Sequence, residues 1–134
     1  MYDVHAILYN AMCHKLCEPI RLLLAYTGTD YEERTLADRA EWNSVKPKLR
    51  LEGMDWPNLP YWIDGEIKLS QSTAILRHIA RQHGLSGKSE AEMRRIDLVL
   101  DQSKDFFNST FAKMCYDPDF VRTKPHFNTI LQPI

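Results

Sequence analysis

Residues Trp56–Gly84 read W-P-N-L-P-Y-W-I-D-G-E-I-K-L-S-Q-S-T-A-I-L-R-H-I-A-R-Q-H-G, and they carry the clearest structural signals of the chain. Asn58-Leu59-Pro60 predicts a turn, because the residue before a proline is held in an extended conformation. Two short strands are expected on either side of the hairpin dipeptide Asp64-Gly65. From Gln71 the apolar residues recur with helical spacing, with Ser70 as the expected N-cap and the final glycine as the C-cap. A turn, a hairpin and a helix start are therefore predicted to meet at one edge.

The predicted helix start in this stretch suits an anion. The N-terminus of a helix carries unpaired N–H groups and the positive end of the helix dipole. Gln71 and Ser72 would add side-chain donors at the same place. We therefore expect a negatively charged group to bind there.

The residues before this stretch predict a strand, a helix and a second strand, over Val4–Tyr9, Glu18–Tyr26 and Tyr31–Leu36. Pro19 fits the first turn of the helix, and Gly28 ends it. A right-handed crossover would make the two strands parallel. Residues 37–55 show no long periodic pattern, so a long functional loop is expected, with at most a short helical turn over Glu41–Val45.

The residues after this stretch predict helices. Ser89 and Glu92 fit a capping box, and apolar positions then recur as far as Met114, which corresponds to a helix of about 40 Å. Asp117-Pro118-Asp119 ends that helix, and residues 125–131 predict the start of another. The chain stops there with apolar residues, so we expect a truncated form of a longer helical domain.

The order of elements predicts an α/β domain followed by an all-α one. A strand–helix–strand half joined to a strand–strand–helix half is the thioredoxin-like plan, in which the proline of a turn such as Leu59-Pro60 is often cis. We therefore expect a thioredoxin-like N-terminal domain over residues 1–84 and a partial helical C-terminal domain over residues 85–134.

The composition argues against several classes of function. The 134 residues carry a formal net charge of -1, which gives no sign of nucleic-acid binding or of an anionic membrane surface. The apolar runs are too short to span a bilayer, and the N-terminus lacks the pattern of a signal peptide. The histidines lack metal-ligand spacing, and three cysteines make no disulfide scaffold. We expect a cytoplasmic protein without a metal.

Three strings resemble the cytosolic glutathione transferases of the mu class: Ile20–Leu24, Trp56–Tyr61 and Gln71–Arg77. The string Ala112–Phe120 extends the resemblance into the helical region. The resemblance implies an enzyme that attacks hydrophobic electrophiles with the thiolate of glutathione. It also implies a homodimer, with glutathione as co-substrate and no further cofactor.

The glutathione thiol must ionise near neutral pH to act as a nucleophile, so it needs a hydrogen-bond donor at the sulfur. The resemblance implies that Tyr9 is this donor if the loop after it holds one residue more than in the family. Counted back from Ile20 without a gap, the family's tyrosine position falls on Asn10. Both alignments stay open at this point.

The resemblance also implies residues for the rest of the ligand, which has two carboxylates and an ammonium group. It assigns Arg39, Trp42 and Lys46 to the glycyl carboxylate, Asn58 and Leu59 to the cysteinyl backbone, Gln71 and Ser72 to the γ-glutamyl carboxylate, Asp105 to the γ-glutamyl ammonium across the dimer, and Tyr116 to the second substrate.

Two other functions remain possible. The first is a truncated protein that binds glutathione without catalysing transfer. The second, less favoured, is a thiol-disulfide oxidoreductase that uses Cys13. Cys13 and Cys17 lie near the start of the first helix, where the dipole lowers a thiol pKa, but their spacing is C-x-x-x-C rather than C-x-x-C.

Overall fold

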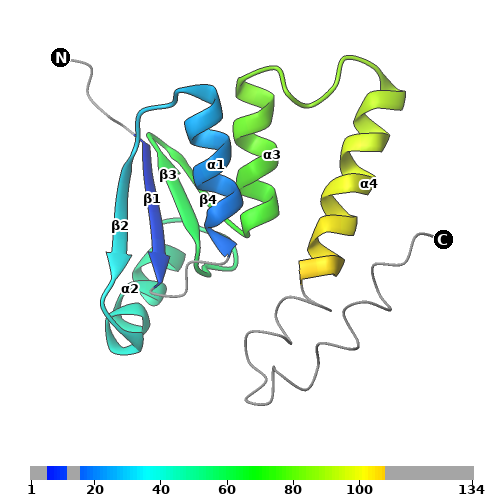
Figure 1. Ribbon diagram of the computed structural model, residues 1–134. Helices are drawn as coiled ribbons and strands as arrows, with labels where there is room; N and C mark the ends of the chain where they lie inside the picture. The colour runs from blue at the N-terminus through cyan, green and yellow to red at the C-terminus, as the bar shows by residue number, and fades with distance from the viewer. Residues whose placement is uncertain (1–5, 12–15, 108–134) are drawn as a thin grey trace. The chain divides into compact units, whose positions relative to one another are not determined.

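The computed structural model describes residues 6–11 and 16–107, which fall into two compact units that divide between Ser86 and Gly87. The first unit contains β1 (Ala6–Ala11), α1 (Glu18–Thr27), β2 (Glu32–Leu36), α2 (Arg39–Leu51), β3 (Tyr61–Asp64), β4 (Ile67–Ser70) and α3 (Ser72–Gln82), and the second contains α4 (Glu90–Phe106) (Figure 1). None of the helices in these described ranges is long and apolar enough to cross a membrane.

The strands of the first unit form a mixed sheet in the order β2-β1-β3-β4. β1 runs parallel to β2 and antiparallel to β3, and β3 runs antiparallel to β4. Helix α1 connects the parallel pair, and the hairpin at Asp64-Gly65 connects β3 to β4. This is the thioredoxin-like arrangement that the order of elements predicts, and the Leu59–Pro60 peptide bond is cis.

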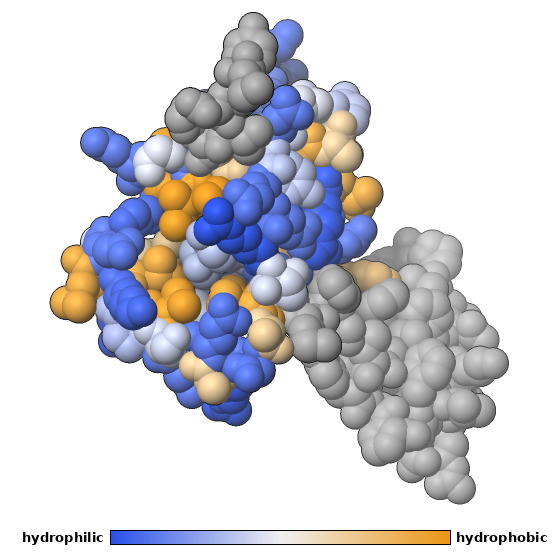
Figure 2. Space-filling model, turned by 90° about the vertical axis from the view of Figure 1, so that its left-hand side faces the viewer, coloured by the Kyte–Doolittle hydropathy of each residue, from blue (hydrophilic) through white to orange (hydrophobic). Residues whose placement is uncertain are grey.

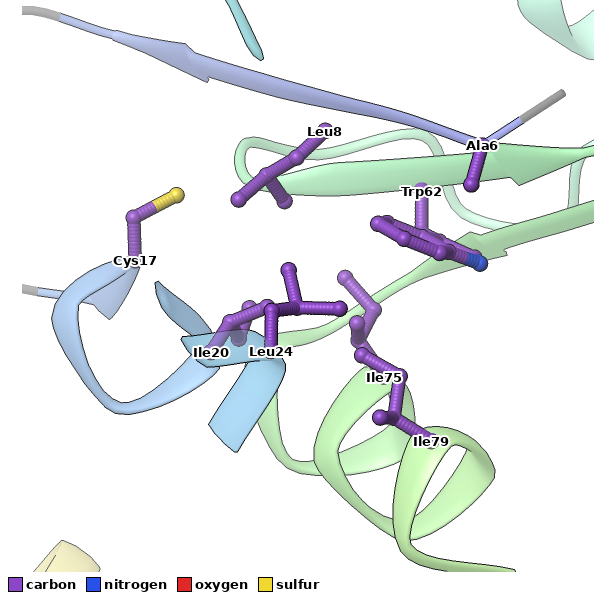
Figure 3. Close-up of a cluster of buried hydrophobic side chains, with 8 residues drawn as sticks. All are labelled: Ala6, Leu8, Cys17, Ile20, Leu24, Trp62, Ile75 and Ile79. Atoms are coloured by element: carbon purple, nitrogen blue, oxygen red, sulfur yellow. The ribbon is translucent and has the colours of Figure 1, made fainter. Parts of the chain in front are cut away.

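Helices α1 and α3 lie side by side over one face of this sheet (Figures 1 and 3). Side chains alternate along a strand, so β1 turns Ala6 and Leu8 towards these helices, and β3 adds Trp62. They meet Ile20, Leu24, Ile75 and Ile79 in one buried cluster. Burying a large aliphatic or aromatic side chain contributes roughly 1.5–3 kcal/mol, so this cluster is a main source of the unit's stability.

Helix α2 packs against the opposite face of the sheet. Its Leu49 joins Met54 and Tyr61 in a second buried cluster. Tyr61 precedes Trp62 in β3, so the two bulky residues point to opposite faces and each anchors one cluster.

The presence of α2 shows that the loop predicted over residues 37–55 was wrong. Asp38 caps the helix: its Oδ1 accepts a hydrogen bond from the Glu41 N–H at 2.8 Å. The Glu41 carboxylate accepts from the Ala37 N–H at 2.7 Å, which completes a capping-box type of arrangement. Pro47 lies inside the helix and lacks an N–H, but it sits on the exposed side.

The start of α3 also differs from the prediction. The N-cap is Gln71 with a φ of +71°, and its side chain makes no capping hydrogen bond. Ser70, the predicted cap, is instead the last residue of β4. At the other end, Gly84 follows the C-cap His83 with a φ of +68° and closes the helix, as a left-handed glycine commonly does.

Helix α4 of the second unit begins at the predicted capping signal. The Ser89 Oγ accepts from the Glu92 N–H at 3.2 Å, and the Glu92 carboxylate accepts from the Lys88 N–H at 2.6 Å. The predicted continuation to Met114 and the helix over residues 125–131 lie outside the described residues.

Candidate functional site

The predicted ligand residues of the first unit come from segments that meet at one end of the sheet. At this end, called the sheet edge below, β1, β2 and β4 finish and β3 begins. Tyr9 of β1 lies opposite Tyr61, which begins β3, and Tyr61 lies opposite Ser70, which ends β4. Because β1 and β2 are parallel, the end of β2 and the following start of α2 at Arg39 reach the same edge. The turn before β3 and the start of α3 are therefore neighbours of the end of β1.

A row of aromatic rings occupies the α2 side of this edge. Tyr9 stacks on Tyr61 with ring centroids 4.3 Å apart and an interplanar angle of 11°. The ring centroids of Trp42, in α2, and Tyr61 are 6.2 Å apart. The Lys46 ammonium lies 5.8 Å from the centre of the Trp42 ring. Leu59 packs against the same cluster. The structure thus brings four predicted site residues together around Tyr61, whose burial raises its pKa well above the usual value.

The hydroxyl of Tyr9 has a cationic neighbour. The Arg34 Nη1 donates a hydrogen bond to the Tyr9 oxygen at 3.1 Å, and the guanidinium lies 5.7 Å from the ring centre. Arg34 also donates two hydrogen bonds to the Glu32 carboxylate, from Nε at 2.7 Å and from Nη2 at 3.1 Å. These hydrogen bonds raise the pKa of Arg34 and lower that of Glu32. Since the Tyr9 oxygen accepts from Arg34, its own proton remains available to an external acceptor.

Tyr9 also lines a depression of about 530 Å³ between α2 and the β2-β1-β3 part of the sheet. This volume lies within the range of small-molecule sites. The lining residues are Tyr9, Arg34, Thr35, Leu36, Glu41, Val45, Lys48, Leu49, Glu52, Tyr61 and Ile63. Figure 2 views the molecule from the left-hand side of Figure 1, where β2 lies, and shows apolar side chains framed by hydrophilic ones.

Asn10 follows Tyr9 in β1 and belongs to the other face of the sheet. It stands in the row of Ala6 and Leu8, the face that α1 and α3 cover, and it is 2% exposed. The two positions that the alignments favour for the thiol donor are therefore on different faces.

The turn before β3 and the start of α3 form the other half of the edge. The Asn58 Oδ1 accepts from the Leu59 N–H at 3.0 Å, so this side chain shapes the turn directly. Gln71 is exposed and Ser72 is half-buried at the first position of α3. Their position at a helix N-terminus matches the chemistry predicted for an anionic group.

The remaining predicted residues lie outside the described part of the first unit. Asp105 lies in the last turn of α4, in the second unit. Tyr116 and Cys13 lie outside the described residues. Within those residues no cluster of three or more histidine, cysteine or acidic side chains could hold a metal ion.

Cys17 is the N-cap of α1 and is fully buried at one end of the first cluster (Figure 3). Burial raises the pKa of its thiol to about 12, so it is not a thiolate at neutral pH. The thiol that would serve as partner to Cys13 in an oxidoreductase is therefore protonated and buried in the folded chain.

Sequence reasoning missed Arg34 and Tyr61. Arg34 was visible as one cation in a charged strand, and only the parallel register of β2 with β1 sets it beside Tyr9. Tyr61 looked like an ordinary strand residue, yet it carries the stacking that joins Tyr9 to Trp42.

Comparison with known proteins supplies a family. Residues 4–81 match the family described as the N-terminal domain of glutathione S-transferase. Over 119 residues the chain is 50% identical to glutathione S-transferase Mu 1 of Bos taurus, and 48% identical to glutathione S-transferase Mu 2 of Homo sapiens. Each alignment covers 84% of this chain and 53% of the relative. The chain therefore spans about half the length of the curated relatives it matches.

Solved structures show the same likeness. A Pi-class glutathione S-transferase from Onchocerca volvulus superposes with a TM-score of 0.73 at 29% identity, over 86% of this chain and 52% of that one. A monomeric glutathione S-transferase from the hookworm Necator americanus superposes with a TM-score of 0.72 at 30% identity, over 89% and 58% of the two chains.

Proposed function

Because this chain belongs to the glutathione S-transferase family, with relatives in the mu class, we propose that it binds glutathione at the sheet edge described above. We further propose that it transfers the glutathione thiolate to a hydrophobic electrophile. The observation that carries the proposal is the convergence of three segments at this edge: the end of β1, the turn before β3 and the start of α3. A peptide-like ligand can touch all three at once.

In this proposal glutathione lies across the edge with its two carboxylates at opposite ends. Arg39, Trp42 and Lys46 of α2 hold the glycyl carboxylate, with the ammonium of Lys46 already placed over the Trp42 ring. Gln71 and Ser72 hold the γ-glutamyl carboxylate, where the N–H groups and dipole of α3 favour negative charge.

The middle of the ligand meets the turn before β3. Asn58 and Leu59 hold the cysteinyl backbone there, Leu59 through main-chain groups in the manner of a strand pairing with a peptide. The mu-class similarity supports two further roles outside the first unit: Asp105 for the γ-glutamyl ammonium across a homodimer, and Tyr116 for the electrophile. Glutathione is a co-substrate in this scheme, and no other cofactor is needed.

The proposed chemistry depends on Tyr9. Its hydroxyl donates to the glutathione sulfur, which favours the thiolate over the thiol and lowers the thiol pKa. Arg34 supports this role, because a cation that donates to the phenol oxygen makes the phenol proton a stronger donor. The thiolate then attacks the electrophilic carbon, a new C–S bond forms and the leaving group departs with its electron pair.

Glutathione is abundant in reducing compartments, and we propose that the protein works in the cytoplasm. The unpaired Cys17 is compatible with such a compartment.

Two measurements on the full chain test the proposal. Isothermal titration with glutathione should give saturable heat, and the chain should accelerate the reaction of glutathione with a chromogenic electrophile. The double variant Lys46→Ala, Gln71→Ala should lose both. Binding without turnover would favour the alternative of a non-catalytic glutathione-binding protein. Absence of any binding by the wild-type chain would end both ideas.

A further inference from the structure

Ser70 connects the two halves of the candidate site. Its hydroxyl donates to the carbonyl oxygen of Trp56 at 2.9 Å and to that of Asp55 at 3.2 Å, as one shared hydrogen bond. Asn58 and Leu59 follow these carbonyls by a few residues, and Gln71 follows Ser70 directly. One hydroxyl therefore ties the turn before β3 to the start of α3.

The backbone on both sides of this hydrogen bond adopts an unfavourable conformation. Trp56 has a φ of +44° and Gln71 a φ of +71°, and among the described residues they are the non-glycine positions with positive φ. L-amino acids avoid this region, and such residues persist only where the surrounding structure holds them. Trp56 is not held by burial of its side chain, because it is 79% exposed.

The neighbouring residue on the same side of β4 makes a second link to the same segment. Lys68 donates to the Glu52 carboxylate at 2.8 Å and to the Glu52 carbonyl at 3.3 Å. Side chains two residues apart on a strand share a face. Lys68 and Ser70 therefore both hydrogen-bond the segment from Glu52 to Trp56 to the end of β4. Of these two contacts, the one made by Ser70 lies near the predicted ligand residues Leu59 and Gln71 in the sequence.

We propose that Ser70 is a positioning residue for glutathione, an assignment that rests on the proposed function. It fixes the distance and orientation between the turn that takes the cysteinyl backbone and the helix start that takes the γ-glutamyl carboxylate. Ser70 touches neither end of the ligand in this scheme. Without its hydroxyl, each half can still form, but the two halves no longer hold the register that one ligand needs.

The test compares Ser70→Thr with Ser70→Val. Threonine and valine have nearly the same shape and both suit a strand, but only threonine keeps the hydroxyl. Ser70→Val should raise the dissociation constant for glutathione about five- to tenfold in isothermal titration, which corresponds to the loss of one hydrogen bond. Ser70→Thr should stay within about twofold of the wild type by the same reasoning.

Thr27→Val is the matched control. The Thr27 hydroxyl also donates to two backbone carbonyls, those of Leu23 and Leu24, but it lies in α1 and links no ligand residues. This variant should show a lower melting temperature with unchanged glutathione affinity. A merely structural Ser70 would behave in the same way as Thr27.

The possible outcomes separate the two proposals. If the wild type binds glutathione and Ser70→Val binds it equally well, the positioning role is wrong and the proposed function stands. If Ser70→Thr is as weak as Ser70→Val, the hydroxyl is not responsible and the inference again fails. If the wild type does not bind, the proposed function and this inference fail together. Should Ser70→Val not fold, Ser70→Ala against Ser70→Thr makes the same comparison.

Discussion

Tyr9 and Asn10 are consecutive residues of β1, and they belong to opposite faces of the sheet. The Tyr9 ring stacks on Tyr61 at 4.3 Å on the α2 side. Asn10 is buried in the row of Leu8, on the side covered by α1 and α3. An alignment shift of one residue therefore selects a different face and a different functional group, a phenol or an amide.

Tyr9→Phe tests which of these groups activates the thiol. The change removes the hydroxyl but keeps the stacking on Tyr61. We expect the pKa of bound glutathione thiol to rise by about one to two units, because a donor to the charged form is lost. The ultraviolet absorbance of the thiolate, followed against pH, measures this shift.

Asn10→Ala is the companion variant, and it should leave the thiol pKa unchanged if Tyr9 is the donor. If the pKa of bound glutathione thiol is unchanged in Tyr9→Phe but raised in Asn10→Ala, Asn10 rather than Tyr9 is the donor to the thiolate. Circular dichroism of both variants shows whether the sheet is retained.

Lys46→Met tests the site for the glycyl carboxylate. We expect glutathione to bind about tenfold more weakly, because a hydrogen bond between charged groups is lost. The wild type should also bind the glycyl ethyl ester of glutathione more weakly than glutathione, and Lys46→Met should hardly distinguish the two ligands. Isothermal titration with both ligands measures this.

Lys48→Met makes the same charge change two residues further along α2. Lys48 lines the depression on the α2 side and makes no contact with Trp42 of the kind that Lys46 makes. It should keep the wild-type preference for the free carboxylate. If both variants weaken binding equally, the effect is a general loss of positive charge and the assignment of Lys46 is wrong.

Cys17 should be unreactive in the folded protein. Burial raises its thiol pKa from 9.0 to about 12, so at pH 8 the folded chain offers almost no thiolate there. Iodoacetamide should therefore label Cys17 only in urea, as read by peptide mass spectrometry. Rapid labelling of Cys17 in the native protein would contradict its burial.

The same shift makes stability depend on pH. An acid whose pKa is raised by folding binds its proton more tightly in the folded state, so stability is unaffected below the unfolded pKa of 9.0. Between about pH 9 and 12 the unfolded chain ionises first, and the free energy of unfolding falls as pH rises. Urea denaturation at pH 8 and pH 10.5 should show this fall, and Cys17→Ala should reduce it.

Gly65→Ala and Gly87→Ala compare two left-handed glycines. Gly65 has a φ of +58° in the β3–β4 hairpin, and an added Cβ would meet nothing within 4 Å. The cost is backbone strain alone, about 1–2 kcal/mol. At Gly87 the φ is +87° and the Cβ would lie 2.9 Å from the Met93 nitrogen, so strain and a clash with backbone combine.

In urea denaturation, Gly65→Ala should therefore lower the free energy of unfolding only slightly. Gly87→Ala should lower the free energy of unfolding more, as measured on the unfolding of α4. Equal losses would mean that the backbone before α4 shifts freely to accommodate the methyl group.

Much of this fold was open to prediction because its signals are local. The hairpin at Asp64-Gly65, the glycine after α3 and the capping box of α4 depend on residues close together in the chain. Helix α2 has a similar signal in Asp38 and Glu41, but residues 37–55 show no long periodic pattern, and Pro47 lies inside the helix. The exposed position of Pro47, where the helix tolerates a proline, follows from tertiary packing and is not visible in the local sequence.

The amino-acid sequence alone predicts the order of the strands and of helices α1, α3 and α4, the family resemblance and the residue types that a charged peptide ligand needs. The three-dimensional structure is needed to see what holds the stretch Trp56–Gly84 together: Ser70, predicted as a helix cap, instead donates to the carbonyls of Trp56 and Asp55. It likewise decided that Arg34 meets Tyr9 and that Asn10 turns away. The physical reason is that strand register and the choice of face arise from long-range pairing, whereas caps and turns arise from neighbours in the chain.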